Sequence, residues 1–406
     1  EKAMEIMNQT KGSKGMLKFA ILAVALVCQI NTIASVMMAD IAAAFPGASD
    51  VAVQYVMQSG MIGGFVVALL MSVLSTRFRK KPMILIGLVA ILVGGLLPIA
   101  VHSSILILDV CGFIVGAGQG FLTPLLGALI LENFEGKERE QMLGLNTTFG
   151  TGGATVLLLI AGPVCKTGWV NVYFIYFVVI PVLIIALLCL AMDNKPQATT
   201  QAGGDKAGVP VKGWIQCILA VLMMIAYASF PLNLSLYVVR DAAIGDASSV
   251  GIGMSLVTVV AALVGLILPQ IIKVSKLYIS SVGAVFGLAA TLLVIFSTNM
   301  VMIYIAAILD GIFFGIVMAG AGYIIGRICT PAQYGPTFSI SMSFISLGTI
   351  FSPIIINAIT TLWGGDVGLS TNAFYTAAGI FAVVIVLQII WGTYLTKTLP
   401  PEKTES

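Results

Sequence analysis

The 406-residue chain has very little charge, because only 9% of its residues are Asp, Glu, Lys or Arg, and it contains a single histidine, His102. A soluble domain carries roughly 25% charged residues, so the composition excludes an ordinary soluble protein. The net charge of +3 is too small to indicate a nucleic-acid partner. No His-Glu-x-x-His pattern is present, and one histidine cannot build a metal site alone. We therefore expect no metal, no cofactor and no enzyme activity.

The phosphate-binding pattern Gly-x-x-x-x-Gly-Lys-Ser/Thr is also absent, and the sequence leaves no soluble domain to hold one. This excludes an ATP-driven transporter. The six cysteines show neither metal-binding nor redox spacing and lie in or beside apolar runs. We interpret them as small buried hydrophobic residues.

Apolar runs near or above the ~20 residues needed to span a bilayer recur along the chain, which is 59% hydrophobic. A transmembrane β-barrel would require alternating segments, and stretches such as residues 87–101 do not alternate. The sequence therefore predicts an all-α polytopic membrane protein. Its first apolar run is expected to be a retained helix rather than a cleaved signal peptide. Twelve transmembrane helices are predicted, at about 17–38, 51–74, 82–101, 105–131, 141–164, 170–192, 214–237, 248–272, 277–296, 300–326, 337–361 and 372–395.

The basic residues are distributed unequally about these twelve spans, which place both termini on the same side of the membrane. Eighteen of the twenty Lys and Arg residues fall on the side of the termini, and only Lys166 and Arg240 fall on the other. Cytoplasmic loops carry an excess of Lys and Arg. We therefore expect a multi-pass protein of the cytoplasmic (inner) cell membrane with both termini in the cytoplasm.

The polar stretch 193–213 between spans six and seven is rich in Gly, Pro, Ala and Thr, as is typical of a flexible linker. It divides the chain into a six-helix bundle at 1–192 and a second at 214–406. A shift of 195 residues superposes the span starts of the two halves. The same shift also superposes three glycines of span four on three of span ten, Gly116 on Gly311, Gly120 on Gly315 and Gly127 on Gly322. These matches favour an internal duplication, with two pseudo-symmetric six-helix repeats.

The twelve spans, the repeat and the central linker together resemble the major facilitator superfamily over essentially the whole chain. The loop "SVLSTRFRKKPMIL" after span two is similar to that family's Gly-x-Leu-Ala-Asp-Arg-x-Gly-Arg-Arg/Lys loop. Leu74, Arg77, Lys80 and Lys81 match it. The departures are Ser72, Thr76 and Arg79, and Thr76 replaces the acid that latches helix ends in the family. The resemblance implies a cytoplasmic gate loop at Arg77, Lys80 and Lys81; the alternative is a basic topology anchor.

The fourth span resembles the family's Arg-x-x-x-Gly-x-Gly-x-Gly helix through Gly116, Gly118 and Gly120. The arginine position holds Gly112 instead. The antiporter signature of the fifth helix is degenerate in residues 145–164, which removes one argument for export.

Two acids lie well within predicted spans, Asp310 about 15 Å into span ten and Asp109 about 6 Å from the outer end of span four. An ionised Asp at the centre of a membrane helix costs roughly 2.5–3.5 kcal/mol, so a protonated Asp310 is favoured. Arg327 is too far along the same helix, at ~25 Å, to neutralise it. Asp310 lies about 100° from the stripe of Gly311, Gly315 and Gly322, so it need not be buried in a helix contact. We predict Asp310, and more weakly Asp109, as proton-coupling residues; the alternative for each is a structural acid.

The resemblance implies that spans one, four, seven and ten line a central cavity. Polar side chains within a span are costly unless they are paired or face water. The substrate-cavity candidates on these spans are Gln29, Asn31, Gln119, Tyr227 and Asn233, with Phe314 offering apolar surface. An interhelical hydrogen bond is the alternative role for each polar residue.

Every Lys and Arg falls in a loop or at the end of a predicted helix, and a desolvated multivalent anion requires a cation. The sequence therefore predicts a secondary active transporter that moves a small neutral, cationic or weakly acidic organic solute by alternating access with proton coupling. An inward-reaching Arg240 or Arg327 is the exception that would admit an anion. An uncoupled facilitator or a flippase for a lipid-like substrate is the alternative, and a non-transporting receptor ranks last. The expected partners are the solute, protons and the lipid bilayer, with the chain acting as a monomer.

Overall fold

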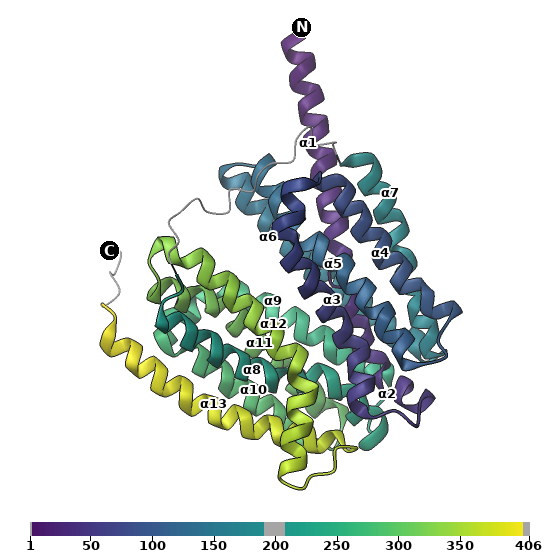
Figure 1. The fold of residues 1–406 in the computed structure, drawn as a ribbon, viewed down its shortest axis with the longest axis vertical. Helices are drawn as coiled ribbons and strands as arrows, with labels where there is room; N and C mark the ends of the chain where they lie inside the picture. Colours follow the sequence, from purple (N-terminus) through teal and green to yellow (C-terminus); the bar gives the residue numbers. More distant parts are fainter. Residues whose placement is uncertain (1, 191–207, 401–406) are drawn as a thin grey trace. The chain divides into compact units, whose positions relative to one another are not determined.

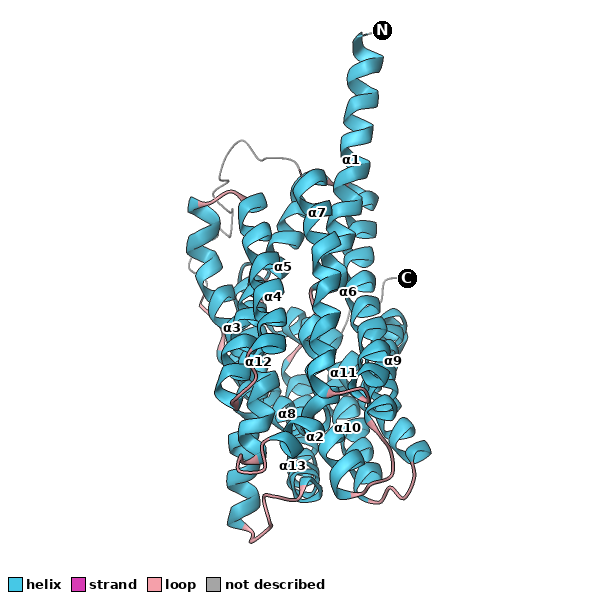
Figure 2. Ribbon diagram, turned by 90° about the vertical axis from the view of Figure 1, so that its right-hand side faces the viewer, coloured by secondary structure: helices cyan, strands magenta, loops and turns pink. Residues whose placement is uncertain are grey.

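The computed structural model describes residues 2–190 and 208–400, and within these ranges it consists of helices joined by short loops without any strand (Figures 1 and 2). Residues 193–207 of the predicted linker lie outside the described residues, and α8 begins within the predicted linker at Val211. The all-α fold expected from the hydropathy pattern is confirmed.

Eleven helical segments are long and apolar enough to cross a membrane in the described part of the chain. One of them, Ala247–Ile295, has 49 residues, which corresponds to about 74 Å of helix, more than twice the ~30 Å hydrocarbon core. It is divided at Lys276–Tyr278, where Lys276 has a φ of 48° and a short 3₁₀ turn separates α9 from α10. Counting α9 and α10 as separate crossings accounts for the twelve predicted spans.

Contacts divide the chain into two compact units, the first comprising Glu1–Ala48 and Tyr55–Gln201. Its elements are α1 (Lys2–Val27), the 3₁₀ helix η1 (Ile30–Ile33), α2 (Ala34–Ala44), α3 (Asp50–Arg77), α4 (Lys80–Ala100), α5 (Ile105–Asn133), α6 (Gly136–Cys165), the 3₁₀ helix η2 (Trp169–Val178) and α7 (Val179–Cys189). In this unit α4 packs on α5, and α1 packs on α6 and α7.

The second unit comprises Ser49–Gln54 and Ala202–Ser406, so the first turn of α3 is grouped with the C-terminal helices. Its elements are α8 (Val211–Ser235), the π-helix η3 (Leu236–Asp241), α9 (Ala247–Ser275), η4 (Lys276–Tyr278), α10 (Ile279–Ile295), α11 (Met300–Ile328), α12 (Pro331–Leu362) and α13 (Ser370–Thr398). Here α11 packs on α9 and α10, while α8 packs on α12 and α13.

Several helix starts in the second unit are fixed by side chains that cap free backbone N–H groups. Asp246 accepts from the Ser249 N–H before α9, and Asn299 accepts from the Met302 N–H before α11. Thr330 begins α12 in a capping box with Gln333. These caps satisfy donors that have no intrahelical partner, which explains why the long apolar runs begin where they do.

Four of the six glycines identified by the repeat, Gly116, Gly120, Gly311 and Gly315, form close helix contacts, whereas a Cβ at Gly127 would meet nothing within 4 Å. A Cβ added to Gly116 on α5 would lie 1.7 Å from the Gly60 carbonyl oxygen on α3. On α11, a Cβ at Gly311 or Gly315 would lie 2.7–2.8 Å from carbonyl oxygens of α9. The packing role predicted for Gly311 and Gly315 is confirmed, whereas Gly322 faces Tyr334 of α12 instead.

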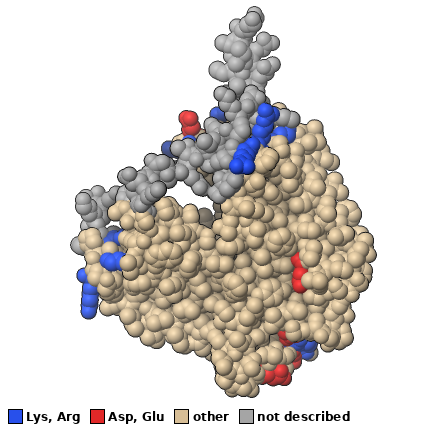
Figure 3. Space-filling view, viewed as in Figure 1, with Lys and Arg blue, Asp and Glu red and all other residues tan. Residues whose placement is uncertain are grey.

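The exterior of the described helices is apolar over long stretches. Large hydrophobic side chains such as Leu106, Leu188 and Leu266 are more than two-thirds exposed. Figure 3 shows one face on which Lys, Arg, Asp and Glu gather mainly near helix ends and the surface between them is almost uncharged. A surface of this kind is suited to lipid rather than to water.

Candidate functional site

Asp310 lies ten residues after the start of α11, about 15 Å along the helix axis. Its side chain is only 2% exposed, and its Oδ2 has no hydrogen-bond partner among the described residues. The sequence predicted that Asp310 lies off the glycine stripe and need not be buried in a helix contact. The structure differs, because Asp310 is buried.

No cation compensates Asp310 in the described part of the chain. None of the ion pairs found there includes it. Arg327, at the far end of the same helix, donates from Nη2 to the Pro400 carbonyl at 2.7 Å. A buried carboxyl without a counter-ion is far less costly when it is protonated, so the surroundings of Asp310 favour its neutral form.

An aromatic stack lies beside Asp310. Tyr227 of α8 stacks on Phe314 with ring centroids 5.0 Å apart and on Phe313 at 5.5 Å. Tyr227 also interacts electrostatically with Asp310. Phe313 is fully buried and makes an edge contact with Phe381 of α13. Tyr227 and Phe314 are only partly buried, so this stack presents an aromatic surface next to the carboxyl group.

Asp109, the second predicted proton-coupling residue, lies in the first unit near the start of α5. It is partly exposed, but its Oδ1 is buried without a hydrogen-bond partner in the described residues. It interacts electrostatically with Tyr173 of η2. His102, just before α5, contacts the Pro98 carbonyl at 2.9 Å and packs edge-on against Trp169.

The polar candidates of span one lie at a break in that span. Gln29 is the residue before η1 and is exposed, and its carbonyl accepts the Thr32 hydroxyl at 2.8 Å. Asn31 is buried and donates from Nδ2 to the Met57 carbonyl at 3.1 Å, so it has the interhelical role that was its alternative. Gln29 lies midway along the Lys14–Ala44 span. Interrupted helices of this kind commonly form midplane binding sites in transporters.

Gln119 on α5 is the remaining candidate of the first unit. It is partly exposed, and its Nε2 is buried without a hydrogen-bond partner in the described residues. An unsatisfied amide donor of this kind is costly unless water or a ligand accepts from it. Gln119 therefore remains a candidate for solute contact.

Asn233 on α8 has partners within its own unit. Its Oδ1 accepts from Gln54 Nε2 at 2.7 Å, and its Nδ2 donates to the Ser229 carbonyl at 3.1 Å. Sequence reasoning missed Gln54, because the pair is separated by 179 positions and only the folded chain brings it together. This paired amide is a weaker solute-contact candidate than Gln119.

Arg240, at the end of η3, forms ion pairs with Asp50 and Asp241. Its Nη1 and Nη2 donate to the two carboxylate oxygens of Asp50 at 2.7 and 2.9 Å, and its Nε donates to Asp241 at 2.7 Å. Its Nη2 also donates to the Gly368 carbonyl at 2.8 Å. Arg240 is therefore occupied by two carboxylates and does not provide the inward-reaching cation that an anionic solute requires.

The predicted gate loop is held by contacts within the first unit. Lys80 is buried and forms an ion pair with Glu132 of α5. Lys81 Nζ donates to the Leu190 carbonyl at 2.6 Å, and Arg77 is exposed at the end of α3. The basic side chains of this loop therefore join α4 to α5 and to the residue that follows α7.

A family model for the Major Facilitator Superfamily matches residues 20–290 and 217–406 of this chain. A comparison with curated protein sequences finds no match.

Solved structures with similar folds include a mutant of the nucleoside transporter NupG, at 13% identity and a TM-score of 0.75, covering 93% of this chain and 99% of that one. A bacterial homologue of the human lysosomal transporter Spinster, inward-facing and occupied, is 14% identical with a TM-score of 0.70, over 95% of this chain and 96% of that one. The POT family transporter PepTSo is 11% identical with a TM-score of 0.71, over 94% and 98%. At these identities the similarity shows the shared fold.

Proposed function

Because this chain belongs to the Major Facilitator Superfamily and is a transporter of that family, we propose that it is a proton-coupled secondary transporter for a small organic solute. The observation that carries the proposal is Asp310, a carboxyl group 15 Å along α11 that is buried and has no cationic partner among the described residues. Such a group is neutral when the site is dry and ionises when water enters. Proton coupling requires a group of this kind, which takes up and releases a proton as the site alternates between its dry and water-filled states.

The charges around the site support a neutral, cationic or weakly acidic solute. In the second unit, Arg240 is engaged by Asp50 and Asp241, and Arg327 reaches the Pro400 carbonyl. The described surroundings of Asp310 therefore provide no fixed positive charge for a multivalent anion. The Tyr227–Phe314 stack favours a solute with a flat or apolar part, and a positive charge on the solute would pair with ionised Asp310.

Of the three transporters with similar folds, only NupG is named with a cargo, a nucleoside, and at 13% identity that name does not identify the substrate of this chain. The substrate must therefore be found by experiment. A thermal-shift screen of small organic metabolites on the purified protein identifies ligands. Each ligand is then tested for uptake into proteoliposomes. A proton gradient of one pH unit is worth about 1.4 kcal/mol, so coupling to one proton drives up to about tenfold accumulation.

Asp310→Asn is the central variant, because it keeps the shape and removes the exchangeable proton. We expect it to retain solute counterflow, which needs binding and alternation only, and to lose gradient-driven accumulation. Asp109→Asn is the matched comparison, since it removes the second predicted proton-coupling acid, on α5 of the first unit. Accumulation that persists in the Asp310→Asn variant would refute the assignment of Asp310. Wild-type uptake that ignores the pH gradient would instead indicate the uncoupled facilitator or flippase.

A further inference from the structure

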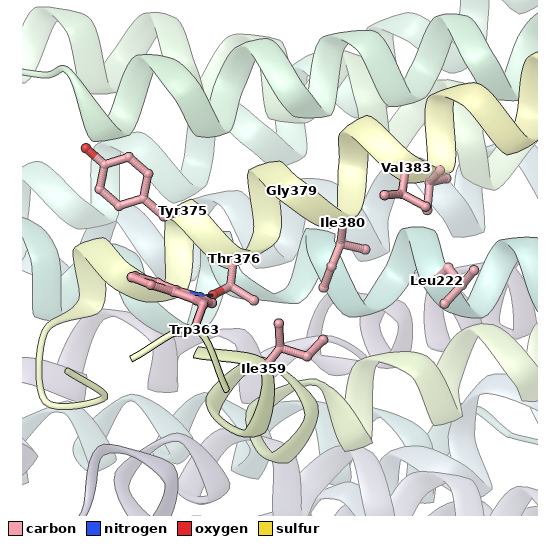
Figure 4. Close-up of a pocket in the computed structure, with 9 residues that line it drawn as sticks. Leu222, Ile359, Trp363, Tyr375, Thr376, Gly379, Ile380 and Val383 are labelled. Atoms are coloured by element: carbon pink, nitrogen blue, oxygen red, sulfur yellow. Dashed lines mark hydrogen bonds between the residues drawn. The ribbon is translucent and has the colours of Figure 1, made fainter. Parts of the chain in front are cut away.

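The second unit contains a cavity of about 380 Å³ between α8, α12 and α13. Asp310 is not among the residues that line it. It is lined by aliphatic and aromatic side chains, with Leu222 on α8, Ile359 on α12 and Ile380 on α13 (Figure 4). Gly379 also lines it, and a Cβ added there would meet nothing within 4 Å. The missing side chain of Gly379 therefore leaves part of the space open.

Two residues that line this cavity carry a hydroxyl, Thr376 and Tyr375. Thr376 Oγ1 is already engaged, since it lies 2.7 Å from Thr360 Oγ1 and accepts from the Trp363 indole nitrogen at 3.0 Å. The Tyr375 hydroxyl points away from the other lining residues (Figure 4). No charged residue of the described chain lines the cavity. A polar solute would lose its hydration here without finding new hydrogen bonds, which is unfavourable. The lining thus selects for an aliphatic ligand.

The depth of the cavity corresponds to one leaflet of a bilayer. Its aromatic residues, Trp363 and Tyr375, lie where α12 ends and α13 begins. Trp and Tyr are enriched at the membrane–water interface, which indicates that this end of the cavity lies at that level. From Tyr375 to Val384 the lining extends nine residues along α13, about 14 Å. This is close to half of the ~30 Å hydrocarbon core.

The cavity is continuous with a lipid-facing surface. The lining residue Val383 is 59% exposed, and farther along α13 Val386 and Ile390 are 57% and 60% exposed. In a membrane protein, an exposed apolar face of this kind is covered by acyl chains. A chain that lies against α13 can therefore enter the cavity beside Gly379 without crossing a polar barrier.

We propose that the cavity between α8, α12 and α13 binds one acyl chain of a membrane lipid, whose headgroup lies at the level of Trp363 and Tyr375. None of Asp310, Tyr227 and Phe314, the residues of the proposed transport site, is among the residues that line this cavity. Gly379 provides the opening, so a bulky side chain at that position takes the place of the lipid chain. Leu222, which lines the cavity from α8, is only partly exposed, so a lipid chain inside the cavity contacts it more closely than a chain outside does.

Photo-crosslinking tests the proposal. The full-length protein is reconstituted in phosphatidylcholine nanodiscs with a trace of phosphatidylcholine bearing a diazirine on its acyl chain, illuminated, and mapped by peptide mass spectrometry. We expect adducts on Leu222 and Ile380 in the wild type and at least fivefold fewer in Gly379→Phe. The matched control is Gly265→Phe, because Gly265 is exposed on α9 and a Cβ there also meets nothing within 4 Å.

Adducts on Leu222 that persist in Gly265→Phe but fall in Gly379→Phe support the proposal. Absence of an adduct on Leu222 in the wild type overturns the proposal by itself. Equal labelling of Leu222 in the wild type and in Gly379→Phe also overturns it. Gly379→Leu provides a second filling variant if Gly379→Phe is not monodisperse. We expect it to lower labelling of Leu222 as well, and unchanged labelling in a monodisperse Gly379→Leu protein overturns the proposal.

Discussion

The contact between α3 and α5 makes a quantitative prediction for Gly116→Ala. The added Cβ would lie 1.7 Å from the Gly60 carbonyl oxygen, about 1.7 Å short of the 3.4 Å at which ordinary contact begins. Both atoms belong to helix backbones, so the helices themselves must separate. Overpacking of this kind costs about 1–3 kcal/mol or more, and the better helix propensity of Ala returns about 1 kcal/mol. We expect a net loss of about 2 kcal/mol.

For a unit of about 200 residues, 1 kcal/mol shifts the melting temperature by roughly 2–4 °C, so Gly116→Ala should melt about 4–8 °C below wild type. The assay is thermal unfolding in detergent, followed by the reaction of the buried cysteines Cys111 and Cys165 with a fluorogenic maleimide. Gly127→Ala, on the same helix, is the control, because a Cβ there meets nothing within 4 Å, and it should melt at or above wild type. A Gly116→Ala protein that melts within 1 °C of wild type would refute the packing argument.

Two further predictions concern polar pairs with at least one buried member, and both are measured by thermal unfolding in detergent. Lys80→Met is followed through Cys111 and Cys165 of the first unit, and Gln54→Leu through the buried Cys217 of the second unit. Lys80→Met should destabilise the first unit by about 1–2 kcal/mol, because the Glu132 side chain loses its ion pair but is 31% exposed and therefore still partly hydrated. Adding Glu132→Leu should recover part of the lost stability. No recovery would argue against the ion pair. Gln54→Leu should cost about 1–3 kcal/mol, because it leaves the buried Asn233 Oδ1 without its donor; a stability equal to wild type would show that the pair contributes nothing.

Features that depend on local spacing were predictable from the sequence. Apolar run lengths gave the helical membrane fold, since a helix must satisfy its own backbone groups in lipid. The 195-residue shift carries α5 onto the bounds of α11, Met300–Ile328. It also carries Gly116 and Gly120, which approach carbonyl oxygens of α3, onto Gly311 and Gly315, which approach those of α9. Small residues at helical spacing therefore predicted where helices touch.

Features that depend on distant partners were not predictable. Asn233 looked like a solute contact because its donor, Gln54, lies 179 positions away. Arg240 looked like a cation able to reach inward because Asp50 lies 190 positions away. The break of span one at η1 was also missed, because residues 28–35 read as a continuous run of apolar and small polar residues. The buried state of Asp310 depends on α8 and its neighbours, which helical phase alone does not reveal.

The backbone contacts of α9 and α11 have a spectroscopic consequence. Because Gly311 and Gly315 place α11 directly against carbonyl oxygens of α9, neither helix can slide along the other without first separating from it. Asp310 immediately precedes the first of these contacts, so its position relative to α9 is fixed. A change in the carbonyl stretching band of its protonated carboxyl group therefore does not report a sliding of α11 along α9.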